Sequence, residues 1–329
     1  MRTTQAEKST IGRSSGWALR RAAIRSMHPL APGPAAQLAA RWFVTPVRTA
    51  PDRGALAPPA EGRRKDSAAS AVDVDPVPLI VSAGERRLAA WSWGRGPLVL
   101  LVHGWSGHGL QLAAMARAIA ERGHRAVAFD QPAHGRSPGR TATIPEMADT
   151  IWQVSEQLGG ARALVAHSLG AVAATVALSR GLAAGRAVFL APPVDPVRWL
   201  ARFGRALGLP ASANPSLVAA LEARAGVPIA ALQPLALAPA LTAELLIVHD
   251  AGDREVPIAD GEALARAWPG ARLVATDGLG HTRLLASPTA VELVADFIGD
   301  EPAAFSSVSA PPALRDRHMA AFADLLGAR

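Results

Sequence analysis

The sequence predicts an α/β protein whose mostly parallel, twisted sheet has helices on both faces. From residue 77 onward, short apolar runs alternate with longer amphipathic stretches. The runs are too short to be helices, and the stretches between them have the length and period of helices, which is typical of βαβ units around a buried parallel sheet. With 329 residues, half of them hydrophobic, the chain is long enough to bury a sizeable core.

The order of the elements predicts where a site should lie. The expected strands are residues 77–81, 87–93, 98–102, 126–129, 163–166, 187–190, 245–248 and 271–275. The expected helices lie near 110–122, 146–158, 169–180, 259–268 and 288–298. The first two runs precede any helix, so we expect them to be antiparallel strands at the sheet edge. Active sites in such sheets lie at the carboxyl ends of the strands.

Composition divides the chain into four parts. Residues 1–34 are expected to be a disordered leader, because three arginines interrupt any apolar run of a secretory signal. An organelle-targeting peptide is the alternative, since the stretch is arginine-rich and poor in acids. Residues 35–70 are expected to form an amphipathic helix and a linker, residues 71–299 the α/β domain, and residues 300–329 a C-terminal linker and short helix.

Charge and residue usage exclude several classes of function. The net charge of +7 belongs to the N-terminal tail, because residues 1–70 carry +8 and the remainder −1. We therefore expect no nucleic-acid partner. The absence of cysteine excludes disulfides, thiolate metal sites and a cysteine nucleophile. Only two of the 34 basic residues are lysines, which is typical of a GC-rich bacterial genome.

Membrane association is expected to be peripheral at most. The uncharged stretch 226–243 contains three prolines, which would break a spanning helix, so it is better explained by short apolar helices that cover a pocket. Residues 35–48 could alternatively contact a membrane surface. We expect a cytoplasmic protein of undetermined oligomeric state.

Chemistry-bearing residues follow four of the expected strands. The motif HGWSG follows residues 98–102, and AHSLG begins at the last residue of the run 163–166. HDAGDREVP follows residues 245–248, and GLGH comes after 271–275. A serine at a tight strand-to-helix turn projects its hydroxyl clear of the sheet, although a serine at that place can also be a simple helix N-cap. The chain order serine, acid, histidine is one of the three known for catalytic triads.

These motifs, together with FDQPAHGRS at 129–137, resemble the α/β-hydrolase superfamily over residues 77–299. The likeness implies the α/β-hydrolase fold with a small helical cap inserted at about 193–240, where the alternation is interrupted. Two departures from the family pattern are Ala166, in place of the first glycine of G-x-S-x-G, and Ala133, in place of the first glycine of D-x-P-G-H-G-x-S.

The resemblance also implies roles for individual residues. Ser168 matches the nucleophile, His281 the base and Asp253 the acid, while Asp250 and Asp195 remain alternative acids. The backbone N–H groups of Trp105 and Leu169 match the oxyanion donors. His103 is expected to shape its loop rather than to act as the base.

The function implied is a serine hydrolase (an esterase) that cleaves small neutral carboxylic esters through an acyl-enzyme intermediate. We expect a small-molecule acyl substrate and neither a cofactor nor a metal, since the histidines are scattered over separate loops and no phosphate-binding glycine motif is present. Acyltransferases, lyases and C–C bond hydrolases can use the same triad and remain alternatives. A catalytically silent binding protein on this fold is a second alternative. Dehalogenases and epoxide hydrolases of this fold use an aspartate nucleophile, so Ser168 speaks against them.

Overall fold

The computed structural model describes residues 15–49 and 75–299, which form two compact units. The sheet unit contains residues 46–49, 75–194 and 230–299, and the helical unit contains residues 15–45 and 195–229. The predicted C-terminal linker and short helix, most of the predicted linker before the sheet, and the first 14 residues of the predicted leader lie outside the described residues.

The sheet unit is built on an eight-stranded sheet in the order β1-β2-β4-β3-β5-β6-β7-β8. Its strands are β1 (Val77–Ala83), β2 (Arg86–Trp93), β3 (Leu98–Val102), β4 (Arg125–Phe129), β5 (Ala163–His167), β6 (Arg186–Leu190), β7 (Glu244–Asp250) and β8 (Arg272–Thr276). The β1–β2 and β2–β4 pairs are antiparallel, and every other pair is parallel. The predicted fold class, including antiparallel strands at one edge, is confirmed.

The strand order reverses direction at β3. Leu101 of this strand pairs with Ala128 of β4 on one side and with Val165 of β5 on the other. Because the chain passes from β3 to β4 on one side and from β5 to β6 on the other, the loops that follow β3 and β5 part at the carboxyl ends of these strands. Open α/β sheets place their ligand sites at such a switch point.

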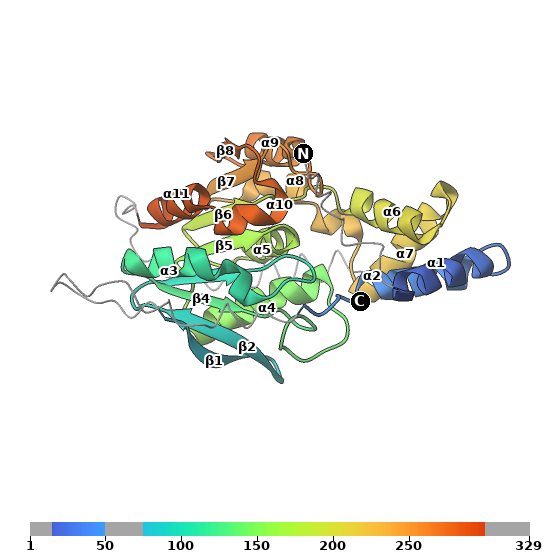
Figure 1. Ribbon diagram of the computed structural model, residues 1–329, viewed down its shortest axis with the longest axis horizontal. Coiled ribbons are helices and arrows are strands. Elements are labelled where there is room, and N and C mark those ends of the chain that lie inside the picture. The colour runs from blue at the N-terminus through green and yellow to red at the C-terminus, as the bar shows by residue number, and fades with distance from the viewer. Residues whose placement is uncertain (1–14, 50–74, 300–329) are drawn as a thin grey trace, which may run out of the picture. The chain divides into compact units, whose positions relative to one another are not determined.

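Helices cover both faces of the sheet. Those that flank it are α3 (Ala113–Glu121), α4 (Ile144–Gln157), α5 (Leu169–Ser179), α9 (Ile258–Ala267) and α11 (Pro288–Gly299). Helices α3 and α11 pack side by side on one face, while α4 and α5 pack against each other on the opposite face (Figure 1). Each helix lies where the sequence predicts one.

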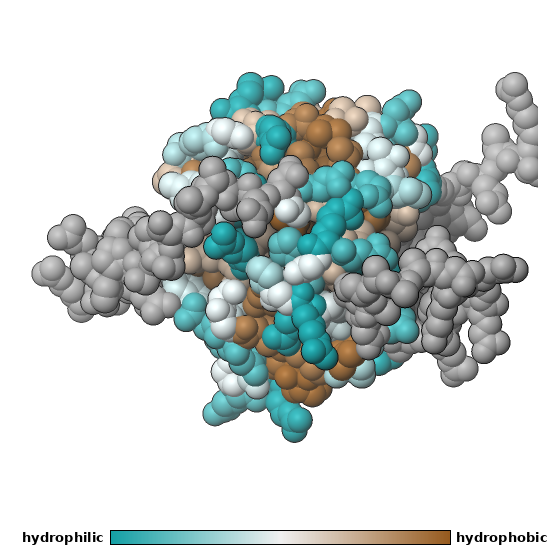
Figure 2. Space-filling view, turned by 90° about the vertical axis from the view of Figure 1, so that its left-hand side faces the viewer, coloured by the Kyte–Doolittle hydropathy of each residue, from teal (hydrophilic) through white to brown (hydrophobic). Residues whose placement is uncertain are grey.

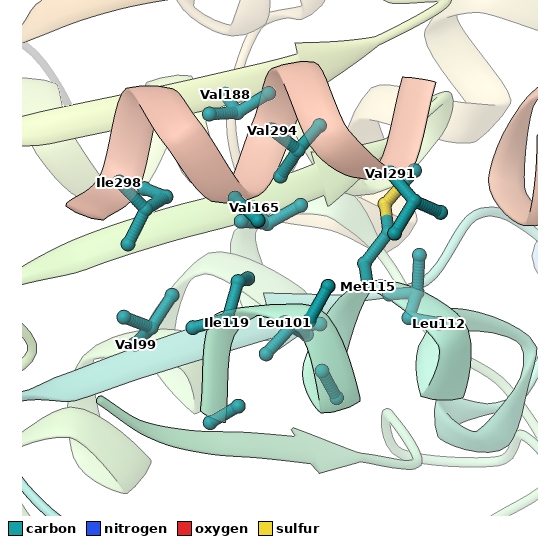
Figure 3. Close-up of a cluster of buried hydrophobic side chains, with 14 of the residues drawn as sticks. Val99, Leu101, Leu112, Met115, Ile119, Val165, Val188, Val291, Val294 and Ile298 are labelled. Atoms are coloured by element: carbon teal, nitrogen blue, oxygen red, sulfur yellow. The ribbon is translucent and has the colours of Figure 1, made fainter. Parts of the chain in front are cut away.

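The core between the sheet and the α3–α11 pair helps to explain why β3 is apolar throughout. Val99 and Leu101 of β3 point toward this pair and meet Met115 of α3 and Val294 of α11 in a continuous buried cluster (Figure 3). The alternate residue Leu100 is also fully buried, on the other face. Each such aliphatic side chain contributes about 1.5–3 kcal/mol when removed from water.

Local signals fix the ends of several helices. At the start of α4, Thr143 and Glu146 form a reciprocal capping box, which satisfies two backbone N–H groups that the helix cannot. The apolar stretch 226–243 forms three short helices, η4 (Ile229–Leu232), α8 (Pro234–Leu237) and η5 (Ala238–Ala240), as its prolines predict. Among the described residues, no helix has both the length and the apolar character needed to cross a bilayer.

The helical unit joins the N-terminal segment to the segment between β6 and β7. It contains α1 (Ser15–Met27), α2 (Pro32–Phe43), α6 (Pro196–Leu207), the single turn η3 (Ala211–Ala213) and α7 (Asn214–Ala225). A common buried cluster includes Ile24 of α1, Ala39 of α2, Leu207 of α6 and Leu217 of α7. The structure therefore differs from the disordered leader expected over residues 1–34, since residues 15–34 include one helix and the start of another.

The boundaries of the predicted cap change for the same reason. A small helical cap was expected at about 193–240, whereas residues 195–229 share their core with residues 15–45 and residues 230–240 belong to the sheet unit. Aromatic edges contribute to this core: Trp17 and Phe43 both meet the ring of Phe203, with centroids 5.7 and 5.2 Å away.

The helical unit is also basic. Its described residues include only two acids, Asp195 and Glu222, beside the arginines at positions 20, 21, 25, 41, 198, 202, 205 and 224. Much of the basic excess that the sequence assigns to a tail therefore lies on folded helices.

The free edge of the sheet is partly apolar. On β1, the side chains of Val77 and Ile80 are 58% and 50% exposed. Figure 2 shows hydrophobic residues gathered at the bottom of the face it presents, where Figure 1 draws β1 and β2. The motifs HGWSG, AHSLG, HDAGDREVP and GLGH lie elsewhere, at the carboxyl ends of β3, β5, β7 and β8.

Candidate active site

Ser168 lies at the sharp turn between β5 and α5. Its backbone has φ +51° and ψ −125°, a conformation that L-residues rarely adopt and that turns the side chain out of the sheet. The turn depends on Gly170, because a Cβ at that position would lie 2.5 Å from the carbonyl oxygen of His103. The helix N-terminus next to Ser168 favours negative charge at this place.

The structure brings Ser168, His281 and Asp253 together. The Nδ1 atom of His281 lies 2.7 Å from Oδ2 of Asp253, and its Nε2 atom lies 3.0 Å from Oγ of Ser168. Since the carboxylate accepts the Nδ1 proton, Nε2 is the free acceptor for the serine hydroxyl. The Asp253 side chain is inaccessible to solvent and that of His281 is 8% exposed, so water does not compete strongly for these bonds.

The turn that carries Asp253 holds the carboxylate in its ionised form. The backbone N–H groups of Glu255 and Val256 donate to Oδ1, at 2.8 and 3.0 Å. Burial alone would raise the pKa of Asp253, but the bond and the charge of His281, together with these two N–H groups, lower it below its usual value. His249 braces the same turn, because its Nε2–H donates to the carbonyl of Val256 at 3.0 Å.

The two alternative acids make other contacts. Asp250 accepts hydrogen bonds from the backbone N–H of Leu279 and the hydroxyl of Thr276, both at 2.9 Å, and from Gly252 N–H at 3.0 Å. It thereby ties the loop that carries His281 to the end of β7. These bonds outweigh the effect of burial and lower the pKa of Asp250.

Asp195 has a helix-capping contact. Its side chain accepts the backbone N–H of Arg198 at 2.9 Å, which makes it the N-cap of α6. Of the three carboxylates considered, Asp253 is therefore the one for which the structure shows a hydrogen bond to the imidazole of His281.

The loop 103–107, which we call the oxyanion loop, lies against the serine. A Cβ at Gly104 would be 3.1 Å from Cβ of Ser168, so a larger residue would need the serine to move by a few tenths of an ångström. His103 shapes the loop: its Nδ1–H donates to the Gly104 carbonyl at 2.7 Å, and its Nε2 accepts the backbone N–H of Gln131 at 2.9 Å. The backbone N–H of Gly107 donates to the same Gly104 carbonyl at 3.0 Å.

The two expected oxyanion donors belong to backbone segments next to Ser168. Trp105 directly follows Gly104 in the oxyanion loop, and its ring meets His134 edge-on at 5.0 Å. Leu169 is the first residue of α5, where a helix offers no internal acceptor for the N–H.

A second turn, residues 130–139, supports the oxyanion loop from the end of β4. The buried carboxylate of Asp130 accepts the N–H groups of Gly109 and Arg136, each at 2.7 Å. Gly135 is required here, since a Cβ would lie 2.1 Å from an Asp130 oxygen. Ala133 has φ +66°, which explains why the family favours glycine at this position.

His167 is a residue of the site that sequence reasoning missed. Its ring contacts that of His281, with centroids 4.7 Å apart, and its Nε2–H donates to the backbone carbonyl of His281 at 3.1 Å. Burial, with a smaller contribution from His281, lowers the pKa of His167 to about 3, so it stays neutral. The available signal was a polar residue at the last position of an otherwise apolar strand.

Because several histidines are buried, we expect the free energy of unfolding to decrease in acid. Burial is the largest cause that lowers the pKa of His103 to about 4 and of His134 to about 3, as it does for His167. The unfolded chain therefore binds protons between pH 6.5 and 4 that the folded chain does not. Stability is full above about pH 6.5 and falls as the pH decreases, by about 1.4 kcal/mol per pH unit for each histidine.

Urea unfolding at pH 7.0, 6.0 and 5.0 measures this slope. We expect the free energy of unfolding to decrease at each step, and the variant His134→Gln to show a shallower dependence because one titrating imidazole is missing. A free energy of unfolding that is flat or rises toward pH 5 would contradict the expectation.

The described residues offer no obvious place for a metal ion. Within residues 15–49 and 75–299, no three histidine or acidic side chains gather in a way that could hold one. The arrangement that is present suits proton transfer and nucleophilic attack by a serine.

The family model of the "Alpha/beta hydrolase family" matches residues 99–296, more than half of the chain. The chain belongs to the α/β-hydrolase family. No curated protein matches the sequence.

Solved structures show the same fold at low sequence identity. The chain is similar to a thermophilic esterase from Thermogutta terrifontis, with 23% identity and a TM-score of 0.51 over 67% of this chain and 96% of that one. An esterase from Exiguobacterium antarcticum shares 18% identity, with a TM-score of 0.52 over 67% and 98%. A 2-hydroxy-6-oxo-6-phenylhexa-2,4-dienoate hydrolase from Rhodococcus sp. strain RHA1 shares 15%, with a TM-score of 0.54 over 68% and 98%.

Proposed function

We propose that the protein is a serine hydrolase that cleaves small neutral carboxylic esters through an acyl-enzyme intermediate. The observation that carries this proposal is the chain of hydrogen bonds from Asp253 through His281 to Ser168, at 2.7 and 3.0 Å, at the carboxyl ends of the strands. Membership of the α/β-hydrolase family supports it, because serine, acid and histidine follow one another in the order of that family.

Acylation begins when Oγ of Ser168 attacks the ester carbonyl. Nε2 of His281 removes the serine proton, and Asp253 stabilises the resulting imidazolium and holds its orientation. The carbonyl oxygen becomes an oxyanion, which the N–H groups of Trp105 and Leu169 stabilise. Loss of one such donor typically raises the barrier by about 2.7–4 kcal/mol.

Collapse of the tetrahedral intermediate breaks the bond to the alkoxy oxygen. The imidazolium of His281 returns its proton to that oxygen, so a neutral alcohol leaves and the acyl group stays on Ser168. A water molecule then attacks the acyl carbonyl while His281 acts as base again. The second collapse releases the carboxylic acid and restores the serine hydroxyl.

The proposed substrate class depends on charge. Residues 71–329 carry a net charge of −1, which disfavours phosphoesters and nucleic acids. The apolar side chains after β6 give only limited support for an apolar acyl pocket. Leu200, Leu207 and Leu217 are among them, and these three fill the core of the helical unit. We propose short-to-medium acyl chains. Fewer than fifty residues separate β6 from the short helices before β7, and so short a segment leaves limited room for an acyl chain beside the triad.

Two measurements test the proposal. A fluorophosphonate probe should label the wild-type protein and not Ser168→Ala. Across p-nitrophenyl esters from C2 to C16, kcat/KM should rise by about fourfold per added methylene until the pocket is filled, because each buried methylene contributes about 0.8 kcal/mol. The maximum should lie below C12.

The outcomes separate the alternatives. Labelling without hydrolysis of any ester would favour an acyltransferase, a lyase or a C–C bond hydrolase. A maximum at C12 or beyond would overturn the proposed chain length, and failure to label would favour a silent binding protein.

A further inference from the structure

A short segment upstream of the sheet contacts the loops that surround the proposed oxyanion site. Residues 46–49, which we call the strap, follow α2 in the chain and belong to the sheet unit. The strap makes hydrogen bonds to the oxyanion loop and to the turn 130–139, at the ends of β3 and β4. No motif in the strap predicts these contacts.

The first contact fixes Ser106. The backbone N–H of Val47 donates to Oγ of Ser106 at 3.0 Å, and the hydroxyl of Thr49 donates to its carbonyl oxygen at 2.8 Å. Ser106 has φ +57°, a conformation that residues other than glycine rarely adopt and that surrounding contacts must therefore maintain. The strap supplies two of them.

Ser106 matters because it directly follows Trp105. Ser106 shares one peptide group with Trp105, and the peptide group before it along the chain carries the Trp105 N–H, which is the proposed oxyanion donor. An oxyanion donor acts only when it points at the position that the oxyanion will occupy, so a small rotation weakens it. The hydrogen bonds of Val47 and Thr49 oppose such a rotation.

The second contact is made by Arg48. Its Nη2 donates to the carbonyls of Ser137 at 2.9 Å and Gly139 at 2.8 Å, and its Nη1 to that of Gly135 at 3.5 Å. A planar guanidinium holds several donors in fixed directions, which the single ammonium of lysine does not. Arg48 therefore ties together the second half of the turn 130–139.

This turn acts back on the oxyanion loop. The backbone N–H of Gln131 donates to Nε2 of His103 at 2.9 Å, and Nδ1–H of His103 in turn donates to Gly104 at 2.7 Å. The strap thus reaches the loop by two routes, directly through Ser106 and indirectly through the turn.

We propose that the strap positions the oxyanion loop for catalysis, with Arg48 and Thr49 as positioning residues that act through Ser106 and the turn 130–139. This inference rests on the proposed function, because it assigns the strap to the same site. An oxyanion donor stabilises the transition state more than the bound ester. Loss of the strap contacts therefore lowers kcat and leaves KM nearly unchanged.

Two variants and a matched control test the proposal. Arg48→Gln removes the guanidinium, and Thr49→Val removes one hydroxyl while keeping the shape of the side chain. Each should lower kcat by about tenfold, less than the 10²–10³-fold typical of losing a donor outright, with KM within about twofold. Arg122→Gln is the control, because Arg122 also binds a backbone carbonyl, that of Ala118, but lies between α3 and α11. It should keep the wild-type kcat.

A second readout does not depend on catalysis. Hydrogen–deuterium exchange of the Gly107 N–H, which is bonded to the Gly104 carbonyl, reports the order of the oxyanion loop. We expect this exchange to be faster in Arg48→Gln and Thr49→Val than in the wild type, and unchanged in Arg122→Gln. If Arg48→Gln does not fold, Thr49→Val alone decides.

The outcomes distinguish the strap from the proposed function. The positioning role of the strap would be overturned if both strap variants kept the wild-type kcat and the wild-type exchange while the protein was labelled by fluorophosphonate. The proposed function would then still stand. An equal loss of kcat in Arg122→Gln would also overturn the strap, since general destabilisation would then explain the effect. If the wild-type protein is neither labelled by fluorophosphonate nor able to hydrolyse an ester, the proposed function fails. Unchanged exchange of the Gly107 N–H in both strap variants would separately overturn the positioning role of the strap.

Discussion

Replacement of Ser168 by alanine should lower kcat for a p-nitrophenyl ester by at least about 10⁴-fold while the protein stays folded. The reason is that no covalent intermediate can form once Oγ, which lies 3.0 Å from Nε2 of His281, is removed. Alanine keeps the Cβ, so the unusual backbone at φ +51° experiences the same steric environment. The measurement is steady-state turnover, together with circular dichroism and a thermal melt.

A matched control is available on the same helix. Ser179, at the far end of α5, donates its hydroxyl to the Val176 carbonyl at 2.8 Å. Ser179→Ala should retain the wild-type kcat and lose at most about 1 kcal/mol of stability, the net contribution of one ordinary hydrogen bond. Activity near the wild-type level in Ser168→Ala, in a preparation free of host esterase, would refute the proposed nucleophile.

Replacement of Asp253 by asparagine should reduce kcat by about 10⁴-fold. The oxygen of an asparagine here would keep the N–H groups of Glu255 and Val256, so its NH2 group would face Nδ1 of His281. Because an NH2 group donates and does not accept, the imidazole favours the tautomer with Nε2 protonated. In that tautomer Nε2 cannot take the serine proton. Since the side chain of Asp253 is completely buried, water cannot replace the lost acceptor.

The neighbouring Asp250→Asn is the matched comparison. Asp250 binds the backbone of the loop that carries His281, at Leu279, but not the imidazole itself. An asparagine retains one oxygen acceptor, so we expect a loss in kcat of about tenfold or less, with a lower melting temperature. A larger loss in Asp250→Asn than in Asp253→Asn would reverse the assignment of the acid.

The central strands were predictable because strands such as β3 and β5 are buried at every position. Leu98–Val102 is apolar at every position, and its length excludes a helix, so the sequence alone indicates a central parallel strand. The motifs then indicated where the candidate site lies, since the residues that follow the parallel strands of an α/β sheet lie at one edge of it. The choice between Asp250 and Asp253 needed the geometry, because Asp250 is the last residue of β7 and Asp253 lies only three residues further on.

Helix α1 was missed for a physical reason. Arg20, Arg21 and Arg25 give it the composition of a leader, and Ile24 is its one fully buried large side chain. The helix is stabilised by partners more than 160 residues away in the chain, on α6. No local pattern carries that information.

The positioning contacts were missed for a related reason. His167 acts on a backbone carbonyl of the loop after β8, and Arg48 acts on three carbonyls of the turn after β4. A carbonyl is present at every residue, so the sequence gives no sign of which one a side chain binds.

The discontinuous make-up of the helical unit has a consequence for biosynthesis. Ribosomes deliver α1 and α2 first, but α6 and α7 only after six strands of the sheet have been made. Until then the buried faces of the first two helices, with Ile24 and Ala39, lack the side chains of α6 and α7 that complete their core. During most of translation, nascent α1 and α2 are therefore accessible to chaperones and proteases. This exposure ends only when α6 and α7 have been made and can pack on them.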